Sequence, residues 1–168
     1  ASPSGSGDVM LKVGVVADLD TDNVFAISGG SDWLAATTQY DMMLNFQPGD
    51  LTAGTSGLAN GCTPNSDYAQ WTCDIKQGLK WSDGQPLTAN DIAFTYRFVI
   101  DNKIPQYKSY FPNNPTFDTP DDHTLVWTAD KPTFAPEMPP WVYIVPEHDW
   151  AQYDGKPLKE IRDVQGMD

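Results

Sequence analysis

The pattern of apolar and polar residues along the chain predicts short strands and helices in quick succession. Residues 9–18 form an apolar, β-branched run, which is typical of a strand buried on both faces. Residues 31–46 repeat apolar side chains at helical spacing, and Ser31 is a suitable N-cap for that helix. Residues 68–75 alternate, so we expect them to form one strand of a hairpin whose turn lies at residues 63–67.

The segment 78–100 predicts a tight turn followed directly by a capped helix. Asp83 and the glycine after it form the turn, and Pro86 permits only an extended or turn conformation before it. Thr88 is suited to cap the helix, and Asp91 completes a capping box in which Asp replaces Glu. An apolar stripe indicates that the helix packs on a sheet: Ile92, Tyr96, Phe98 and Val99. We therefore interpret the segment as scaffold.

The rest of the chain predicts short elements separated by turns rich in proline and aspartate. Strands are expected at residues 114–118, 123–129 and 141–145. Short helices are expected at residues 146–155, with Pro146 in the first helical position, and at residues 157–164. The small, polar residues 1–8 predict a flexible leader, and the absence of an initiator Met or signal segment fits a mature or recombinant start.

The charge of the chain limits the classes of partner that it is expected to bind. Its 168 residues include 10 basic and 23 acidic side chains, so the net charge is −13 and the isoelectric point lies near 4.2. A polyanion would be repelled, and no Lys/Arg stripe offsets that field, which argues against nucleic acid as a partner. No run approaches the ~20 apolar residues of a transmembrane helix.

The two cysteines, Cys62 and Cys73, flank the predicted hairpin turn. Two strands joined by a turn can bring such residues to disulfide distance, and a disulfide would indicate an oxidising compartment outside the cytoplasm. The alternative is a pair of buried free thiols.

The sequence contains no clear pattern of catalytic or metal-binding residues. His123 and His148 lie in no cluster with ligand spacing, and both are expected to be solvated surface imidazoles. Asp18, Asp20 and Asp22 match the first ligand positions of a calcium loop, but Asn23 and Gly29 stand where that loop needs Gly and Glu. We therefore expect no catalytic residue, no metal and no cofactor, and do not expect an enzyme.

The six tryptophans suggest an alternative, a secreted carbohydrate-binding or adhesive surface module. Most of them fall inside strand or helix patterns, where core packing is their usual use. They are Trp33, Trp71, Trp81, Trp127, Trp141 and Trp150.

A gapless series of residues follows the pattern of a strand, an Asp-Gly-x-Pro-Leu-Thr-Ala turn and a helix: Ile75, Lys76, Gly78, Leu79, Trp81, Asp83, Gly84, Pro86, Leu87, Thr88, Ala89, Asp91, Ile92 and Phe94. This run resembles the signature region of the family 5 bacterial extracellular solute-binding proteins, the oligopeptide, dipeptide and nickel receptors of ABC importers. Further similar segments lie at residues 37–46, 56–61, 119–136 and 144–152.

The resemblance implies an α+β fold with a mixed or antiparallel sheet and packed helices, as in the amino-terminal part of a type II (cluster C) periplasmic-binding-protein receptor. Residues 9–46 would then begin lobe I, and residues 47–168 would form the small extra domain of the family. The resemblance also implies a fragment without the second lobe, and we expect an exposed apolar edge on the first strand and helix where that lobe would pack.

The function implied is that of an extracytoplasmic receptor, periplasmic or a surface lipoprotein, which binds an oligopeptide or other solute for ABC importer membrane subunits. The loop after the first strand would border the ligand cleft, and a second group of candidates is weaker. The expected ligand-binding residues are Asn23, Val24, Phe25, Ala26 and Ile27, followed by Tyr107, Tyr110 and Phe111.

Overall fold

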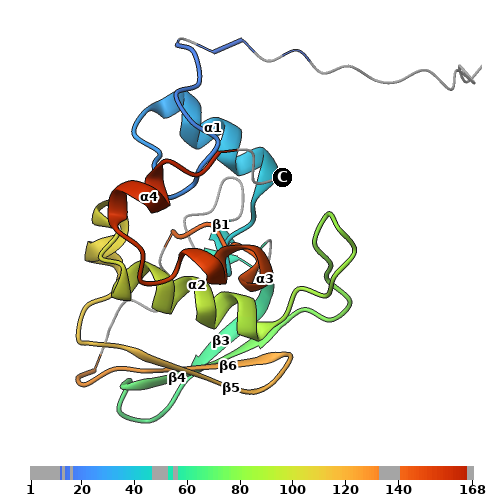
Figure 1. Cartoon of the computed structure of the whole chain (residues 1–168). Coiled ribbons are helices and arrows are strands. Elements are labelled where there is room, and N and C mark those ends of the chain that lie inside the picture. Colours follow the sequence, from blue (N-terminus) through green and yellow to red (C-terminus); the bar gives the residue numbers. More distant parts are fainter. Residues whose placement is uncertain are drawn as a thin grey trace, which may run out of the picture.

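The computed structural model of the chain describes residues 12, 14–15, 17–46, 53–54, 57–132 and 141–165. Helices and strands occur in a mixed order along the chain (Figure 1). In sequence they are α1 (Gly30–Gln39), β1 (Asn45–Phe46), β2 (Ala53–Gly54), β3 (Ala59–Pro64), β4 (Gln70–Ile75), α2 (Ala89–Asp101), η1 (Pro105–Tyr110), β5 (Thr116–Asp121), β6 (Thr124–Thr128), α3 (Glu147–Trp150), η2 (Ala151–Tyr153) and α4 (Leu158–Arg162).

The main sheet has four antiparallel strands in the order β3-β4-β6-β5, and α2 packs across it. In Figure 1 the helices lie on one side of this sheet. Strand β4 alternates exposed and buried residues, so that Trp71, Cys73 and Ile75 face the core. The α+β prediction is confirmed, and the four-stranded sheet is antiparallel throughout rather than mixed. Of the strands predicted in the second half, those at residues 114–118 and 123–129 are confirmed as β5 and β6.

The hairpin of β3 and β4 holds the two cysteines directly opposite each other. Cys62 pairs with Cys73 in the strand register, their Cα atoms are 4.0 Å apart, and they form a disulfide. The disulfide interpretation is therefore confirmed, and the free-thiol alternative is wrong. The bridge ties the edge strand β3 to the interior of the sheet.

The capped helix is also confirmed. Helix α2 has Thr88 as its N-cap: the Thr88 hydroxyl accepts the Asn90 N–H at 3.2 Å, and the Asp91 carboxylate accepts the Thr88 N–H at 2.9 Å. The predicted stripe is the buried face of the helix, since Ile92, Tyr96, Phe98 and Val99 are all at most 1% exposed.

An extended segment after α1 connects the amino-terminal part to the rest of the core. The carbonyls of Met42 and Met43 accept the N–H groups of Leu58 and Ala59 at 3.0 and 2.8 Å, respectively. On its other side, the carbonyl of residue 41 accepts the N–H of Ile144 at 2.9 Å. Only glycine fits beside this segment at position 57, because a Cβ there would lie 2.5 Å from the Met42 carbonyl oxygen.

These contacts explain why the helix predicted for residues 31–46 is too long. Helix α1 ends at Gln39 and Tyr40 is extended, because the backbone beyond it hydrogen-bonds to other segments instead. Ser31 is not the N-cap; Gly29 is, and its N–H is accepted at 3.3 Å by the carboxylate of Asp32.

One strand prediction is wrong, and a second is not met at the residues that the structure describes. Residues 141–145 contribute one isolated bridge, from Tyr143 to Met42, and no strand. In residues 9–18, the described positions 12, 14, 15, 17 and 18 are exposed and belong to no strand, and the others lie outside the described residues. An apolar run becomes a buried strand only where neighbouring strands supply hydrogen bonds.

The helices predicted after residue 145 are confirmed as α3 and α4. Pro146 is the N-cap of α3 rather than its first helical residue. None of the described helices is long and apolar enough to span a membrane.

Candidate functional site

The loop predicted to contact a ligand is buried in this chain. The Asn23 side chain donates hydrogen bonds to the carbonyls of Ile161 and Val164 at 2.7 and 3.1 Å and accepts the Phe25 N–H at 2.8 Å. Asn23 therefore fastens the loop to the end of helix α4, with its polar atoms used inside the protein.

The apolar residues of the loop are core residues. Val24 and Phe25 are fully buried and Ile27 is 5% exposed. The ring of Phe25 packs against Phe98 and Trp150, with centroid distances of 5.1 and 4.8 Å.

The second group of candidates joins the same core. Tyr107 is fully buried, and its hydroxyl donates to the Val24 carbonyl at 2.8 Å. Burial raises the pKa of Tyr107 far above its usual value, so the phenol stays neutral and remains a donor. Ala26, Tyr110 and Phe111 are half-buried. Ligand contact by all eight residues stays a prediction; in this chain most of their side chains point inward.

A cavity of about 400 Å³ lies elsewhere, beside the strand–turn–helix segment that we interpreted as scaffold. We call it the Trp81 pocket. Five separate parts of the chain contribute to it: the loop before α1, the end of α1, the residue before β3, the turn before α2, and helix α3 with the proline before it. The lining residues are Asp22, Gln39, Tyr40, Asp41, Leu58, Leu79, Lys80, Trp81, Ser82, Asp83, Leu87, Pro146, His148, Asp149 and Trp150.

One wall of the pocket is a tightly bonded turn. The Trp81 N–H donates to the Gln85 carbonyl at 2.9 Å, and the Leu87 N–H donates to the Leu79 carbonyl at 3.0 Å. Within the turn, the Asp83 carboxylate accepts the Gln85 N–H at 2.8 Å. The glycine after Asp83 has a φ of +87°, which is why this position suits glycine.

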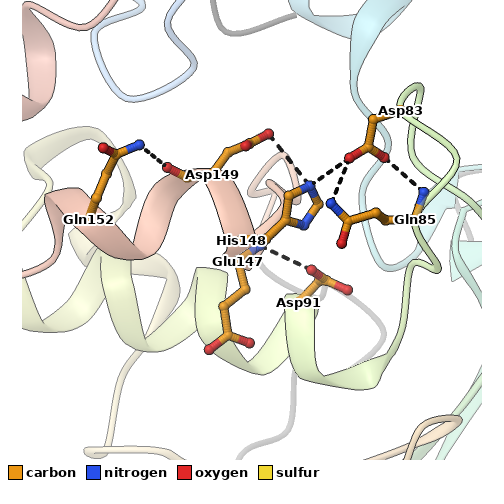
Figure 2. Close-up of polar contacts among 7 residues, drawn as sticks. All are labelled: Asp83, Gln85, Asp91, Glu147, His148, Asp149 and Gln152. Carbon is orange, nitrogen blue, oxygen red and sulfur yellow. Dashed lines mark hydrogen bonds and ion pairs between the residues drawn. The ribbon is translucent and has the colours of Figure 1, made fainter.

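The opposite wall is held in place by Asp91. While one oxygen of its carboxylate caps α2, the other accepts the Glu147 N–H at 3.0 Å (Figure 2). This bond fixes the start of α3 above the start of α2. Helix α3 then presents His148 and Asp149 to the pocket.

His148 bridges the two walls. Its Nε2 atom lies 3.1 Å from a carboxylate oxygen of Asp83 and 3.6 Å from one of Asp149, as Figure 2 shows. The hydrogen bond from the Gln85 N–H, assisted by His148, holds the pKa of Asp83 below its usual value, so Asp83 carries its charge at neutral pH. The contacts of His148 given by the described residues are to the carboxylates of Asp83 and Asp149.

The remaining candidates of the sequence are dispersed. No group of three His, Cys, Asp or Glu side chains within the described ranges could hold a metal ion. The His148 side chain is 28% exposed, and His123 is half-buried with its Nδ1 atom away from solvent, so the imidazole of His123 is only partly solvated. Trp71, Trp127 and Trp150 are buried in the core, which removes half of the tryptophans from any exposed aromatic shelf.

The sequence did not predict the Trp81 pocket. Its Asp-Gly turn and His-Asp pair are visible as local signals, but they lie 65 residues apart. No local pattern indicates that such distant segments face each other across a cavity.

Comparison with known proteins places the chain in a family. The model of the bacterial extracellular solute-binding proteins, family 5 Middle, matches residues 54–163, well over half of the chain. A probable D,D-dipeptide-binding periplasmic protein of Escherichia coli is 28% identical over 131 residues, which cover 76% of this chain and 25% of that protein. The chain thus spans about a quarter of the length of this relative.

Solved structures show the same fold. An ABC transporter substrate-binding protein of Listeria monocytogenes superposes with a TM-score of 0.70 at 22% identity, covering 84% of this chain and 29% of that one. The oligopeptide-binding protein OppA of Haemophilus influenzae, in complex with the peptide RPPGFSPFR, gives a TM-score of 0.67 at 18% identity over 89% of this chain and 33% of that one. At these identities the likeness concerns the fold.

Proposed function

Because the chain belongs to family 5 of the bacterial extracellular solute-binding proteins, we propose that it is part of a solute receptor that serves an ABC importer. The observation that carries the proposal is the match over residues 54–163, which includes the complete hairpin, turn and capped helix. Within this part, the polar groups of Thr88 and Asp91 are used in the helix cap, which supports a role in positioning rather than in contacting the solute.

We propose an oligopeptide as the solute. The D,D-dipeptide named for the Escherichia coli relative and the peptide bound to the Haemophilus influenzae protein support this class of ligand. Peptide would be held mainly by the parts of the receptor outside this chain, since the predicted loop is buried here.

The exposed apolar residues of the amino-terminal part support a fragment that packs on a further lobe. Val15, Leu19 and Leu34 are 46%, 55% and 46% exposed. They belong to the predicted first strand, the loop after it and α1, where such an apolar edge was expected. A self-contained carbohydrate-binding module has less support, because half of its candidate tryptophans are in the core.

The receptor would work outside the cytoplasm, either in a periplasm or anchored at the surface as a lipoprotein, and would deliver solute to the membrane subunits of an importer. The Cys62–Cys73 disulfide supports an oxidising compartment.

The test is calorimetric titration of the full-length receptor, freed of bound ligand by partial unfolding and refolding, with unmodified peptides of two to five residues. Saturable binding of at least one peptide length, with no heat from maltotriose, is expected. Binding of the trisaccharide alone would overturn the peptide assignment and favour the carbohydrate module.

A further inference from the structure

We propose that the Trp81 pocket binds an organic cation, an ammonium or guanidinium group carried on an apolar chain or ring. This inference does not depend on the peptide receptor function, because it rests only on the residues that line the pocket. Its three supports are the size and apolar lining of the cavity, the sign of the charge around it, and the ring nitrogen of His148 that already contacts two of its carboxylates.

The apolar lining suits the body of such a ligand. Leu58, Leu79, Leu87 and Pro146 contribute aliphatic surface, and Trp81 contributes an aromatic ring that is only partly buried. A volume of about 400 Å³ lies at the small end of ordinary ligand pockets, so a single side chain or small amine fits, and a long peptide does not. An aromatic ring next to carboxylates is the usual composition of sites for organic cations.

The charge of the pocket favours a cation over an anion. Its lining includes four aspartates, Asp22, Asp41, Asp83 and Asp149, against one lysine, Lys80. Helix α1 ends at Gln39, which also lines the pocket, and its last turn contains no basic residue. The carbonyl end of a helix carries partial negative charge, which adds to the field of the carboxylates.

His148 lies between two of these carboxylates. Its Nε2 atom is 3.1 Å from Asp83 of the turn and 3.6 Å from Asp149 of its own helix, so both carboxylates face a ring nitrogen in the pocket as they would face the nitrogen of a ligand.

The experiment is a titration of the full-length protein with benzylamine and, as the matched anion, benzoate, followed by tryptophan fluorescence and calorimetry at low salt. Benzylamine is expected to bind saturably and benzoate not at all. Asp83→Asn and Asp149→Asn should each weaken benzylamine binding roughly two- to fivefold, as expected for a partly exposed ion pair, and the double variant should weaken it further. Asp122→Asn, which changes an exposed carboxylate outside the pocket, is the control and should leave the affinity unchanged.

Equal binding of benzylamine and benzoate would overturn the proposal, as would an equal loss in Asp122→Asn and Asp83→Asn. Circular dichroism confirms that each variant is folded. Failure of the peptide titration would leave these results standing, since the probes contain no peptide.

Discussion

The Asp91 carboxylate connects helix α2 to helix α3, and its removal gives the sharpest test of the local structure. Asp91 is 6% exposed, and its two oxygens accept two different backbone donors, Thr88 N–H at 2.9 Å and Glu147 N–H at 3.0 Å. In Asp91→Ala both donors lose their acceptor, and no other group in the capping box can replace it.

The magnitude follows from these two bonds. Loss of a helix cap destabilises by about 1 kcal/mol, and a buried donor left unsatisfied by about 1–3 kcal/mol. We therefore expect Asp91→Ala to lower the free energy of unfolding by roughly 2–4 kcal/mol, a large part of the ~5–15 kcal/mol that stabilises an ordinary domain. Asp91→Asn keeps one acceptor oxygen, so about half of that loss is expected.

Urea unfolding followed by circular dichroism measures the effect, with Asp122→Ala as the matched control. Asp122 is exposed and its side chain makes no hydrogen bond to the other described residues, so its replacement should change stability by less than about 0.5 kcal/mol. If Asp91→Ala were as mild as the control, the bond to Glu147 would not position α3. If Asp91→Asn lowered the free energy of unfolding as much as Asp91→Ala, the loss would not depend on the number of acceptor oxygens that remain.

Three further predictions concern buried groups. Tyr96→Phe should leave the free energy of unfolding unchanged or higher, because the buried Tyr96 hydroxyl has no hydrogen-bond partner among the described residues. Tyr107→Phe should lower it by about 1 kcal/mol, because the hydrogen bond to the Val24 carbonyl is lost. Equal effects of the two substitutions in thermal unfolding would contradict this prediction. Reduction of the Cys62–Cys73 bridge should lower the free energy of unfolding by roughly 3 kcal/mol, and a double Ser variant should then be insensitive to reductant. Hydrogen bonds from the N–H of residue 20 and from further N–H groups lower the pKa of Asp32. The ionised carboxylate therefore stabilises the fold above the ordinary aspartate range, and this stabilisation is lost as the pH falls through the lowered pKa. In urea unfolding at stepwise lower pH, the free energy of unfolding should fall less steeply in Asp32→Asn than in the unchanged protein.

Features decided within a few residues were predictable. The cap of α2 needs only Thr88 and Asp91, three positions apart, and the hairpin needs only its turn and alternation, which together place Cys62 opposite Cys73. The amino-acid sequence likewise carried the family resemblance, because the strand, turn and helix follow one another without interruption.

Features that depend on distant partners were not predictable. Helix α1 stops early because the backbone after it bonds to residues 58, 59 and 144. The loop expected to face a ligand is buried because Asn23 bonds to carbonyls 138 and 141 residues away.

The sequence by itself therefore determined the family, the disulfide and the capped helix, since these depend on neighbours along the chain. Tertiary structure alone decided which side chains are buried and where a cavity remains. The Trp81 pocket exists because Asp91 holds α3 over α2 and thereby brings His148 to Asp83, 65 residues away. Its acidic lining comes from distant segments that tertiary packing brings together, and no local sequence pattern predicts such packing.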